Sequence, residues 1–360
     1  MEKQPEPEVI EKPVETTSPV AVSEPGKKPI LVIVGLVAVT AVGAGVAYAI
    51  LGRSKTSVAP VASSTPALTA TTNATAATPT ATPTPTPAGT TISVKEEGKL
   101  ILPGGYADPT VVPYSGGFRM YVNSFGHGPS GYLTYTSPDG VTWTKEKGII
   151  ISGVATGRAI VLPTGIRFYY PGMQPIKPSD PQADMLSSFS SDGITWKKDA
   201  GTILSPRSNL YYVEGPTVFQ LPDKTWRMYF NENTVAAGNN RDGSIWGASS
   251  ADGTTWKRDA ALTLEADGVT ETGTTTWKQA LHPFVVTNPK GGYIMFYNAH
   301  SELYAATSTD GLTWKKIGKI GVHGADADGY FLADGTFRLF YGGFSEKDGG
   351  LIYMAVLNVK

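Results

Sequence analysis

Short stretches that alternate hydrophobic and polar residues follow one another from about residue 91 to the C-terminus. Stretches such as GRAIVLP, IRFYYPG and MLSSFS are typical of short strands separated by turns. Four times, such a series ends in a phrase of the form Ser-x-Asp-Gly-x-Thr-Trp. Asp-Gly predicts a tight turn, because glycine accepts a positive φ and aspartate tolerates one. The aspartates of the four phrases are Asp139, Asp192, Asp252 and Asp310.

The four phrases recur at nearly regular intervals, with their aspartates 53, 60 and 58 residues apart. A repeat near 50 residues that holds four short strands is typical of a β-propeller blade, and the tryptophan of each phrase is large enough to pack between neighbouring blades. A fifth unit, DADGYFLADGTFRLFYGG and LIYMAVLNV, supplies three strands, and residues 93–102 resemble the missing fourth. We therefore predict an all-β, five-bladed β-propeller over residues 91–360, with an N-terminal strand that closes the last blade.

The first 90 residues differ in composition from the rest of the chain. Residues 1–28 are rich in Glu and Pro without a hydrophobic period, which predicts disorder. Residues 29–52 are uncharged and long enough to cross a bilayer as a transmembrane helix, and residues 53–90 form a Thr/Pro/Ala-rich linker. We expect a single-pass membrane anchor with a cytoplasmic N-terminus and an extracytoplasmic propeller. The stretch Ala47-Tyr48-Ala49 keeps a cleaved signal peptide as the alternative.

Composition narrows the classes of function. The chain has no cysteine, which excludes disulfides, thiolate metal sites and a cysteine nucleophile. The formal net charge of -1 gives no electrostatic reason to expect nucleic acid as a partner. We expect the propeller to be monomeric.

Candidate chemistry lies at the start of the inner strand of each predicted blade, because the inner strands of a propeller surround one central channel. We aligned these strands by their apolar residues Val111, Ile160, Val218, Val285 and Phe331. The residues that meet at the channel mouth in this alignment are Asp108, Arg158, Glu214 or its neighbour Gly215, His282 and Asp328. Carboxyl groups held together in a partly buried site have pKa values pushed apart, as glycoside hydrolysis requires of its acid and base.

Two of these stretches resemble a known group of enzymes. YADPTVVP and YVEGPTVF are similar to the Asp-Pro and Glu-Gly-Pro motifs of the five-bladed glycoside hydrolases, a superfamily that includes the family 43 arabinanases and xylosidases and fructan-hydrolysing relatives. The resemblance covers residues 93–360 and implies a carbohydrate substrate, Asp108 as general base and Glu214 as general acid. It also implies inversion of stereochemistry, with the two carboxyl groups roughly 6.5–9.5 Å apart. No cofactor is required, although His282 matches the neighbourhood of a structural calcium ion in some relatives.

The second blade departs from this pattern. Where the superfamily places another aspartate, the chain reads GRAIVLP, with Arg158 and Ala159 in its place. Asp328 could substitute for the missing carboxylate, as could Asp180 or Asp184 in the second-blade loop. The alternative function is therefore a non-catalytic propeller that binds a carbohydrate or a protein through the same mouth.

Three further residues are expected at the rim of the pocket. Tyr212 precedes Glu214, Trp277 lies in a polar approach to the fourth blade, and His127 lies in the GHGPSG loop. An aromatic ring at such a rim offers a stacking surface to a sugar.

Overall fold

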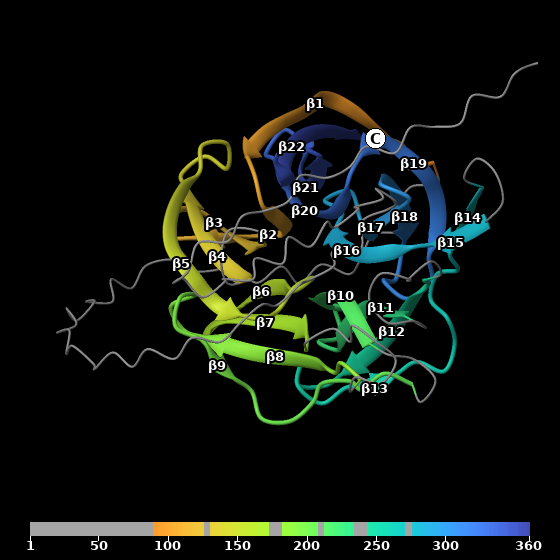
Figure 1. The fold of residues 1–360 in the computed structure, drawn as a ribbon. Helices are drawn as coiled ribbons and strands as arrows, with labels where there is room; N and C mark the ends of the chain where they lie inside the picture. The colour runs from red at the N-terminus through yellow and green to blue at the C-terminus, as the bar shows by residue number, and fades with distance from the viewer. Residues whose placement is uncertain (1–88, 126–129, 173–181, 208–211, 234–242, 271–275) are drawn as a thin grey trace, which may run out of the picture. The chain divides into compact units, whose positions relative to one another are not determined.

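The computed structural model describes residues 89–125, 130–172, 182–207, 212–233, 243–270 and 276–360. Within these ranges the chain forms five four-stranded antiparallel sheets and a further two-stranded sheet. The sheets are arranged as blades around a common centre, as the all-β prediction requires (Figure 1). The predicted N-terminal segment and transmembrane helix, and all but the end of the predicted linker, lie outside the described residues. No helix among the described residues is long and apolar enough to span a membrane.

Each blade is a meander in which the innermost strand comes first. Blade one comprises β2 (Tyr106–Tyr114), β3 (Gly117–Ser124), β4 (Gly131–Ser137) and β5 (Thr144–Ser152). Blade two comprises β6 (Arg158–Leu162), β7 (Gly165–Pro171), β8 (Met185–Ser190) and β9 (Lys197–Lys198). Blade three comprises β10 (Tyr212–Gln220), β11 (Trp226–Asn233), β12 (Ile245–Ser250) and β13 (Lys257–Arg258).

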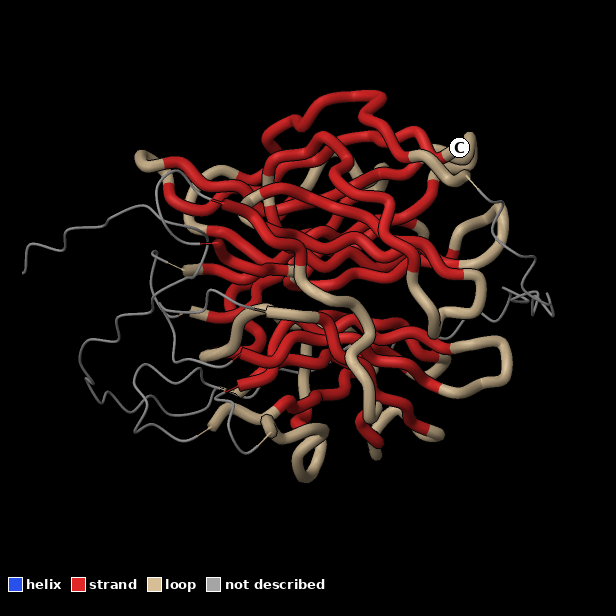
Figure 2. The backbone as a smooth tube through the Cα atoms, turned by 90° about the vertical axis from the view of Figure 1, so that its right-hand side faces the viewer, coloured by secondary structure: helices blue, strands red, loops and turns tan. Residues whose placement is uncertain are grey.

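The remaining strands complete the ring. Blade four comprises β16 (Leu281–Thr287), β17 (Tyr293–Ala299), β18 (Glu302–Ser308) and β19 (Lys315–His323). Blade five comprises β20 (Ala325–Phe331), β21 (Phe337–Ser345), β22 (Gly349–Val359) and, as its outer strand, β1 (Ile92–Leu102). A two-stranded arm, β14 (Asp267–Thr270) and β15 (Thr276–Gln279), precedes blade four. Figure 2 shows how strands dominate the described chain.

The first and last described strands close the ring, as predicted. Strand β1 pairs with β22 in an antiparallel register that runs from Ile92 opposite Val359 to Leu102 opposite Ile352. Thr91 and Lys360 exchange two backbone hydrogen bonds, of 2.8 and 3.0 Å, just beyond this register. The fifth blade is therefore built from both ends of the described chain.

The repeated Asp-Gly phrases dock neighbouring blades onto one another. In each phrase the aspartate accepts two backbone N–H bonds within its own turn; Asp252, for example, accepts from Thr254 and Thr255 at 2.7 Å each. In the phrases of blades two, three and four, the turn then offers its glycine carbonyl to a buried tyrosine of the preceding blade. The three tyrosine bonds run from Tyr121 to Gly193, from Tyr169 to Gly253 and from Tyr229 to Gly311. These phrases are therefore structural, and their tryptophans pack against the same tyrosines or nearby rings.

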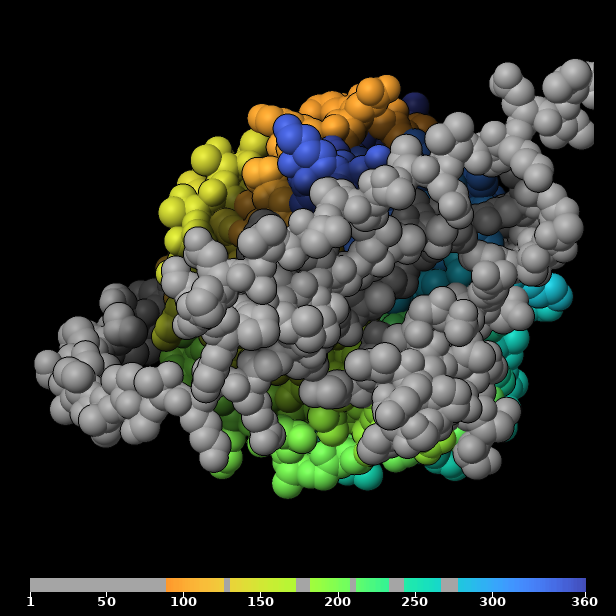
Figure 3. All heavy atoms as spheres, viewed as in Figure 1, coloured from red at the N-terminus to blue at the C-terminus, as the bar shows by residue number. Residues whose placement is uncertain are grey.

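Lysine marks the outer strand of every blade. Lys145, Lys197, Lys257 and Lys315 lie in the outer strands of blades one to four, and Lys95 lies in that of blade five. An outer strand exposes unpaired backbone groups, and charged side chains there oppose edge-to-edge association. In the space-filling view, the yellow and green rim of the domain belongs to blades one and two (Figure 3).

A chain that begins at Gly104 loses β1 and leaves the edge of β22 unpaired. We expect its melting temperature, followed by circular dichroism, to fall by more than about 10 °C relative to a chain that begins at Gly89. The reason is that closure of the ring is lost together with one strand of blade five. Equal melting temperatures for the two chains would contradict the closure.

Candidate active site

The inner strands β2, β10, β16 and β20 share a distortion near their first residues. In each, a residue with a positive φ is followed by a register shift against the second strand, as in a β-bulge. These residues are Asp108 (φ 50°), Gly215 (φ 57°), His282 (φ 50°) and Asp326 (φ 57°). The left-handed conformation costs a residue other than glycine about 1–3 kcal/mol, so surrounding contacts must hold three of the four in place.

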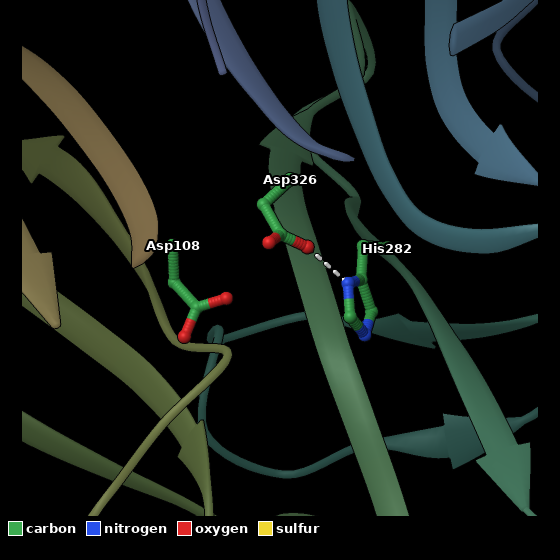
Figure 4. A group of neighbouring side chains, drawn as sticks. All are labelled: Asp108, His282 and Asp326. Atoms are coloured by element: carbon green, nitrogen blue, oxygen red, sulfur yellow. Dashed lines mark hydrogen bonds and ion pairs between the residues drawn. The ribbon is translucent and has the colours of Figure 1, made fainter. Parts of the chain in front are cut away.

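Three of these side chains converge. Asp108 of blade one, His282 of blade four and Asp326 of blade five point toward one another (Figure 4). One oxygen or nitrogen atom of each lies within 4.8 Å of those of the other two. His282 Nδ1 is hydrogen-bonded to Asp326 Oδ1. A pocket opens here, and the residues that line it are Asp108, Pro109, Thr156, Gly157, Arg158, Gly215, His282 and Asp326.

The carboxyl group of Asp108 is buried and held by two donors. Its Oδ2 accepts from Asn123 Nδ2 at 3.1 Å and from the backbone N–H of Thr156 at 2.9 Å. Burial, reinforced by the negative charge of Asp326, raises the pKa of Asp108 from 3.8 to about 7, although His282 and the two donors oppose the shift. Asp108 can therefore change its protonation state near neutral pH, as a catalytic acid or base must.

His282 lies between two carboxylates. Burial alone would lower its pKa, but Asp326 and Glu214 outweigh burial and raise the pKa of His282 well above 6.5. Its Nε2 is 3.7 Å from Glu214 Oε1, on the side opposite the bond to Asp326. Burial would raise the pKa of Asp326, but the positive charge of His282 lowers it overall. The directions of these shifts favour a proton on His282 and a negative charge on Asp326.

Asparagines at the ends of the second strands support the strained residues. Asn231 Oδ1 of blade three accepts from the backbone N–H of His282 at 2.6 Å, and Asn298 Oδ1 of blade four accepts from that of Asp326 at 3.5 Å. Asn123 of blade one bonds to the Asp108 side chain instead. The sequence carries a signal for these residues, since YVN, YFN and FYN end the second strands of blades one, three and four. These asparagines were not predicted from the sequence.

Asp328 and Arg158, both predicted at the channel mouth, form a buried ion pair. Arg158 Nη1 is 2.5 Å from Asp328 Oδ2, and Asp328 Oδ1 accepts from the backbone N–H of Val111 at 3.1 Å. Thr110 accepts in the same way from Ala159, at 3.2 Å. Asp328 therefore connects blade five to blades one and two, whereas Asp326, two residues earlier, lines the pocket. Arg158 lines it as well.

The other predicted residues have varied positions. Glu214 is 4% exposed, lies beside His282, and is not among the described residues that line the pocket. Tyr212 is buried at the start of β10. Trp277 lies on β15 opposite Val269, and its side chain is not among those that the structure describes. His127 lies outside the described residues.

Asp180 and Asp184 were the other predicted substitutes for the second-blade aspartate. Asp180 lies outside the described residues. Asp184 Oδ2 accepts from Thr202 Oγ1 at 3.0 Å, within the loops of the second blade. The carboxylate that joins Asp108 in the pocket is instead Asp326, from the fifth blade.

A cation is a second way to join Asp108, His282 and Asp326, because their ligand atoms are close together. The histidine nitrogen that faces Asp326 is already bonded to that carboxylate, and His282 has a raised pKa. A metal ligand must be the neutral imidazole with a free nitrogen. Calcium, moreover, takes six to eight oxygen ligands. A proton on His282 and a cation held by this cluster are therefore alternative ways to balance the two carboxylates.

Comparisons with known proteins concern the fold of the propeller. Residues 108–279 match the model of the glycosyl hydrolases family 32 N-terminal domain. No curated protein sequence matches the chain. Among solved structures, a thermostable family-43 glycoside hydrolase is 15% identical with a TM-score of 0.53, over 74% of this chain and 96% of its own. The endo-arabinase of Bacteroides thetaiotaomicron is 12% identical with a TM-score of 0.55, over 73% and 98%.

A third similar structure carries a different name. An N-acetylgalactosamine deacetylase from F. plautii, solved with blood group B trisaccharide, is 14% identical with a TM-score of 0.55, over 74% of this chain and 95% of its own. At such identities these likenesses establish the fold alone. Together with the match to the family 32 domain, they confirm the resemblance of the propeller to the five-bladed glycoside hydrolase superfamily.

Replacement of Asp108 by Asn should stabilise the protein at alkaline pH. The folded-state pKa of Asp108 is about 7 against 3.8 for the ordinary group, so its favourable contribution is present at low pH and is lost as the pH rises through 7. We expect the Asp108→Asn variant to be about 1–3 kcal/mol more stable than the parent at pH 8.5, and the gain to shrink toward pH 4.

Urea unfolding at both pH values measures this difference. Glu346→Gln, which removes an exposed carboxylate, is the matched control and should change stability by less than about 0.5 kcal/mol. A destabilised Asp108→Asn variant at pH 8.5 would contradict the strained, proton-binding environment.

Proposed function

We propose that the propeller is a glycoside hydrolase whose reaction takes place in the pocket at Asp108. The observation that carries the proposal is the convergence of Asp108, His282 and Asp326 from three blades on one pocket, with protonation preferences that differ. Glycosidic bond cleavage requires one group that holds a proton and one that accepts a proton, at opposite sides of the bond. The superfamily resemblance directs this chemistry to carbohydrate.

Asp108 acts as the general base. In its ionised form it takes a proton from a water molecule whose oxygen attacks the anomeric carbon. As the bond from that carbon to the leaving oxygen breaks, Glu214 gives its proton to the leaving oxygen. Asp108 has the better support of the two, because it lines the pocket and has a pKa of about 7.

His282 and Asp326 serve the proton-donating side of the reaction. Nε2 of His282 is 3.7 Å from Glu214 Oε1, which lets the imidazolium orient Glu214 and return a proton to it. The bond to Asp326 holds the ring and its positive charge in place. Asp326 thereby takes the part that the superfamily gives to the missing second-blade aspartate.

This mechanism requires no metal ion, since a proton on His282 balances the charges of the cluster. Removal of divalent cations with EDTA should therefore leave turnover unchanged.

The proposed location is the cell surface. Residues 29–52 anchor the chain in the membrane, and residues 53–90 hold the propeller outside it, near the glycans on which it acts.

Substitution of the proposed base and acid tests the chemistry. We expect Asp108→Asn and Glu214→Gln to lower kcat/KM by roughly 10²- to 10⁴-fold on a panel of aryl glycosides and polysaccharides, because each removes one proton transfer. In the parent, kcat/KM should rise as the pH increases through about 7, where Asp108 loses its proton.

Glu96→Gln is the control and should retain full activity, since its carboxylate is exposed on β1, the outer strand of blade five. His282→Gln separates the two donors: if this variant is inactive while Glu214→Gln is not, His282 donates the proton directly. Acetate release from acetylated sugars without cleavage of glycosidic bonds would contradict the proposal.

The stereochemical outcome tests the mechanism independently. Single displacement with Asp108 as base and Glu214 as acid predicts that the first sugar released has the inverted anomeric configuration, as ¹H NMR at early times can measure. Retention would instead make Asp108 a nucleophile, because only a covalent intermediate followed by water attack restores the configuration.

A non-catalytic carbohydrate- or protein-binding propeller is the second candidate. The observation in its favour is that blade two supplies Arg158, paired with Asp328, where the superfamily supplies a carboxylate. Glycan binding without turnover, unchanged in Glu214→Gln, would favour this candidate over the enzyme.

A further inference from the structure

The hairpin between β21 and β22 exposes a large apolar side chain. Phe344 is 67% exposed, the highest value among the large hydrophobic residues that are exposed in the described part of the chain. Val161 and Leu312 follow at 52% and 49%. A single exposed hydrophobic residue is ordinary on a protein surface, so its position has to decide whether it has a role.

The register of blade five places Phe344 on the pocket side of its strand. Pairing between β21 and β22 is regular from Phe337 opposite Leu357 to Ser345 opposite Gly349, so side chains alternate without interruption. Gly342 and Phe344 therefore share a face. A Cβ at Gly342 would lie 3.4 Å from Asp326 Oδ2, so this face looks toward the Asp326 carboxylate of the pocket. Phe344 lies two residues further along the strand, on the same face and about 7 Å from Gly342.

The surroundings of Phe344 hold the hairpin and leave the ring uncovered. Its cross-strand partner is Gly350, and a Cβ at Gly350 would collide with the ring of Phe125 and the carbonyl of Tyr106 in blade one. The backbone N–H of Gly105, next to β2, donates to Asp348 O at 3.2 Å. The hairpin is thus fastened to blade one at the end where β2 carries Asp108. Phe344 has glycines at 342, 343 and 350 around it, and the ring of Phe125 occupies the space next to Gly350.

We propose that Phe344 is a binding subsite for a sugar residue next to the one that is cleaved. The C–H face of a sugar ring is apolar and matches the size of a phenyl ring, and stacking removes both surfaces from water. A ring about 7 Å beyond the Asp326 side of the pocket suits a second sugar unit. The ligand is therefore an oligosaccharide or glycan chain of at least two units. This inference rests on the proposed function for its ligand.

Kinetics on two substrates of one sugar tests the subsite. For Phe344→Ala we expect KM to rise roughly five- to tenfold on an oligosaccharide and to stay unchanged on the aryl monoglycoside, because only the longer substrate reaches the ring. Phe344→Trp keeps an aromatic face and should retain the parent KM. Leu312→Ala is the matched control: Leu312 is also exposed, but lies in an Asp-Gly turn at the opposite end of its blade.

Binding measured without turnover separates this inference from the proposed function. Calorimetry with the oligosaccharide on full-length Asp108→Asn, with and without Phe344→Ala, should show affinity reduced by a similar factor. If binding depends on Phe344 but the parent never turns over a glycan, the subsite stands and the hydrolase fails.

Three results overturn the subsite. The first is parent turnover with no effect of Phe344→Ala on the longer substrate. The second is an equal effect on both substrates or in Leu312→Ala. The third is a change in sedimentation that makes Phe344 a contact between copies of the chain. Absence of both glycan binding and turnover across the panel overturns both proposals.

Discussion

The pairing of β1 with β22 is the interaction on which the rest of the structure depends. A propeller without closure has a free edge and five inner strands with no fixed relation to one another. Once the fifth blade is completed by the N-terminal strand, the starts of β2, β16 and β20 are held around one centre. Asp108 and Asp326 are separated by most of the domain in sequence, yet they line the same pocket because the ring is closed.

The same constraint explains how the blades stay in register. Each Asp-Gly turn satisfies its own backbone with the aspartate, and three of the four then present a glycine carbonyl to a tyrosine of the neighbouring blade, as Gly253 does for Tyr169. Nearer the channel, Thr110 and Asp328 accept from backbone N–H groups of the next blade. Repetition in the sequence thus reflects repeated contacts between blades, whereas the residues of the candidate site differ from one blade to the next.

The fold could be predicted from sequence, because turn residues and tryptophans recur at a spacing that alternation and blade size explain. The site could be predicted only in part. Alignment of inner strands by apolar residues placed Phe331 opposite Val111, whereas the observed register makes Gly329 the equivalent of Val111. Because Gly329 has no apolar side chain, the alignment by apolar residues was wrong by two positions. Asp328 was therefore predicted at the channel mouth in place of Asp326. Positive φ at Asp108, His282 and Asp326 is likewise invisible without coordinates, since only Gly215 has the residue type that suggests it.

The missing second-blade aspartate then has a physical interpretation. Asp328 carries a buried negative charge that has to be neutralised, and Arg158 of blade two does this at 2.5 Å. Burial raises the pKa of Asp328 even so, although Arg158 opposes the shift. A carboxylate at position 158 would place two like charges in this dry contact, which is costly. The arginine therefore belongs to the contact between blades, and the carboxylate that lines the pocket with Asp108 is Asp326, which is hydrogen-bonded to His282.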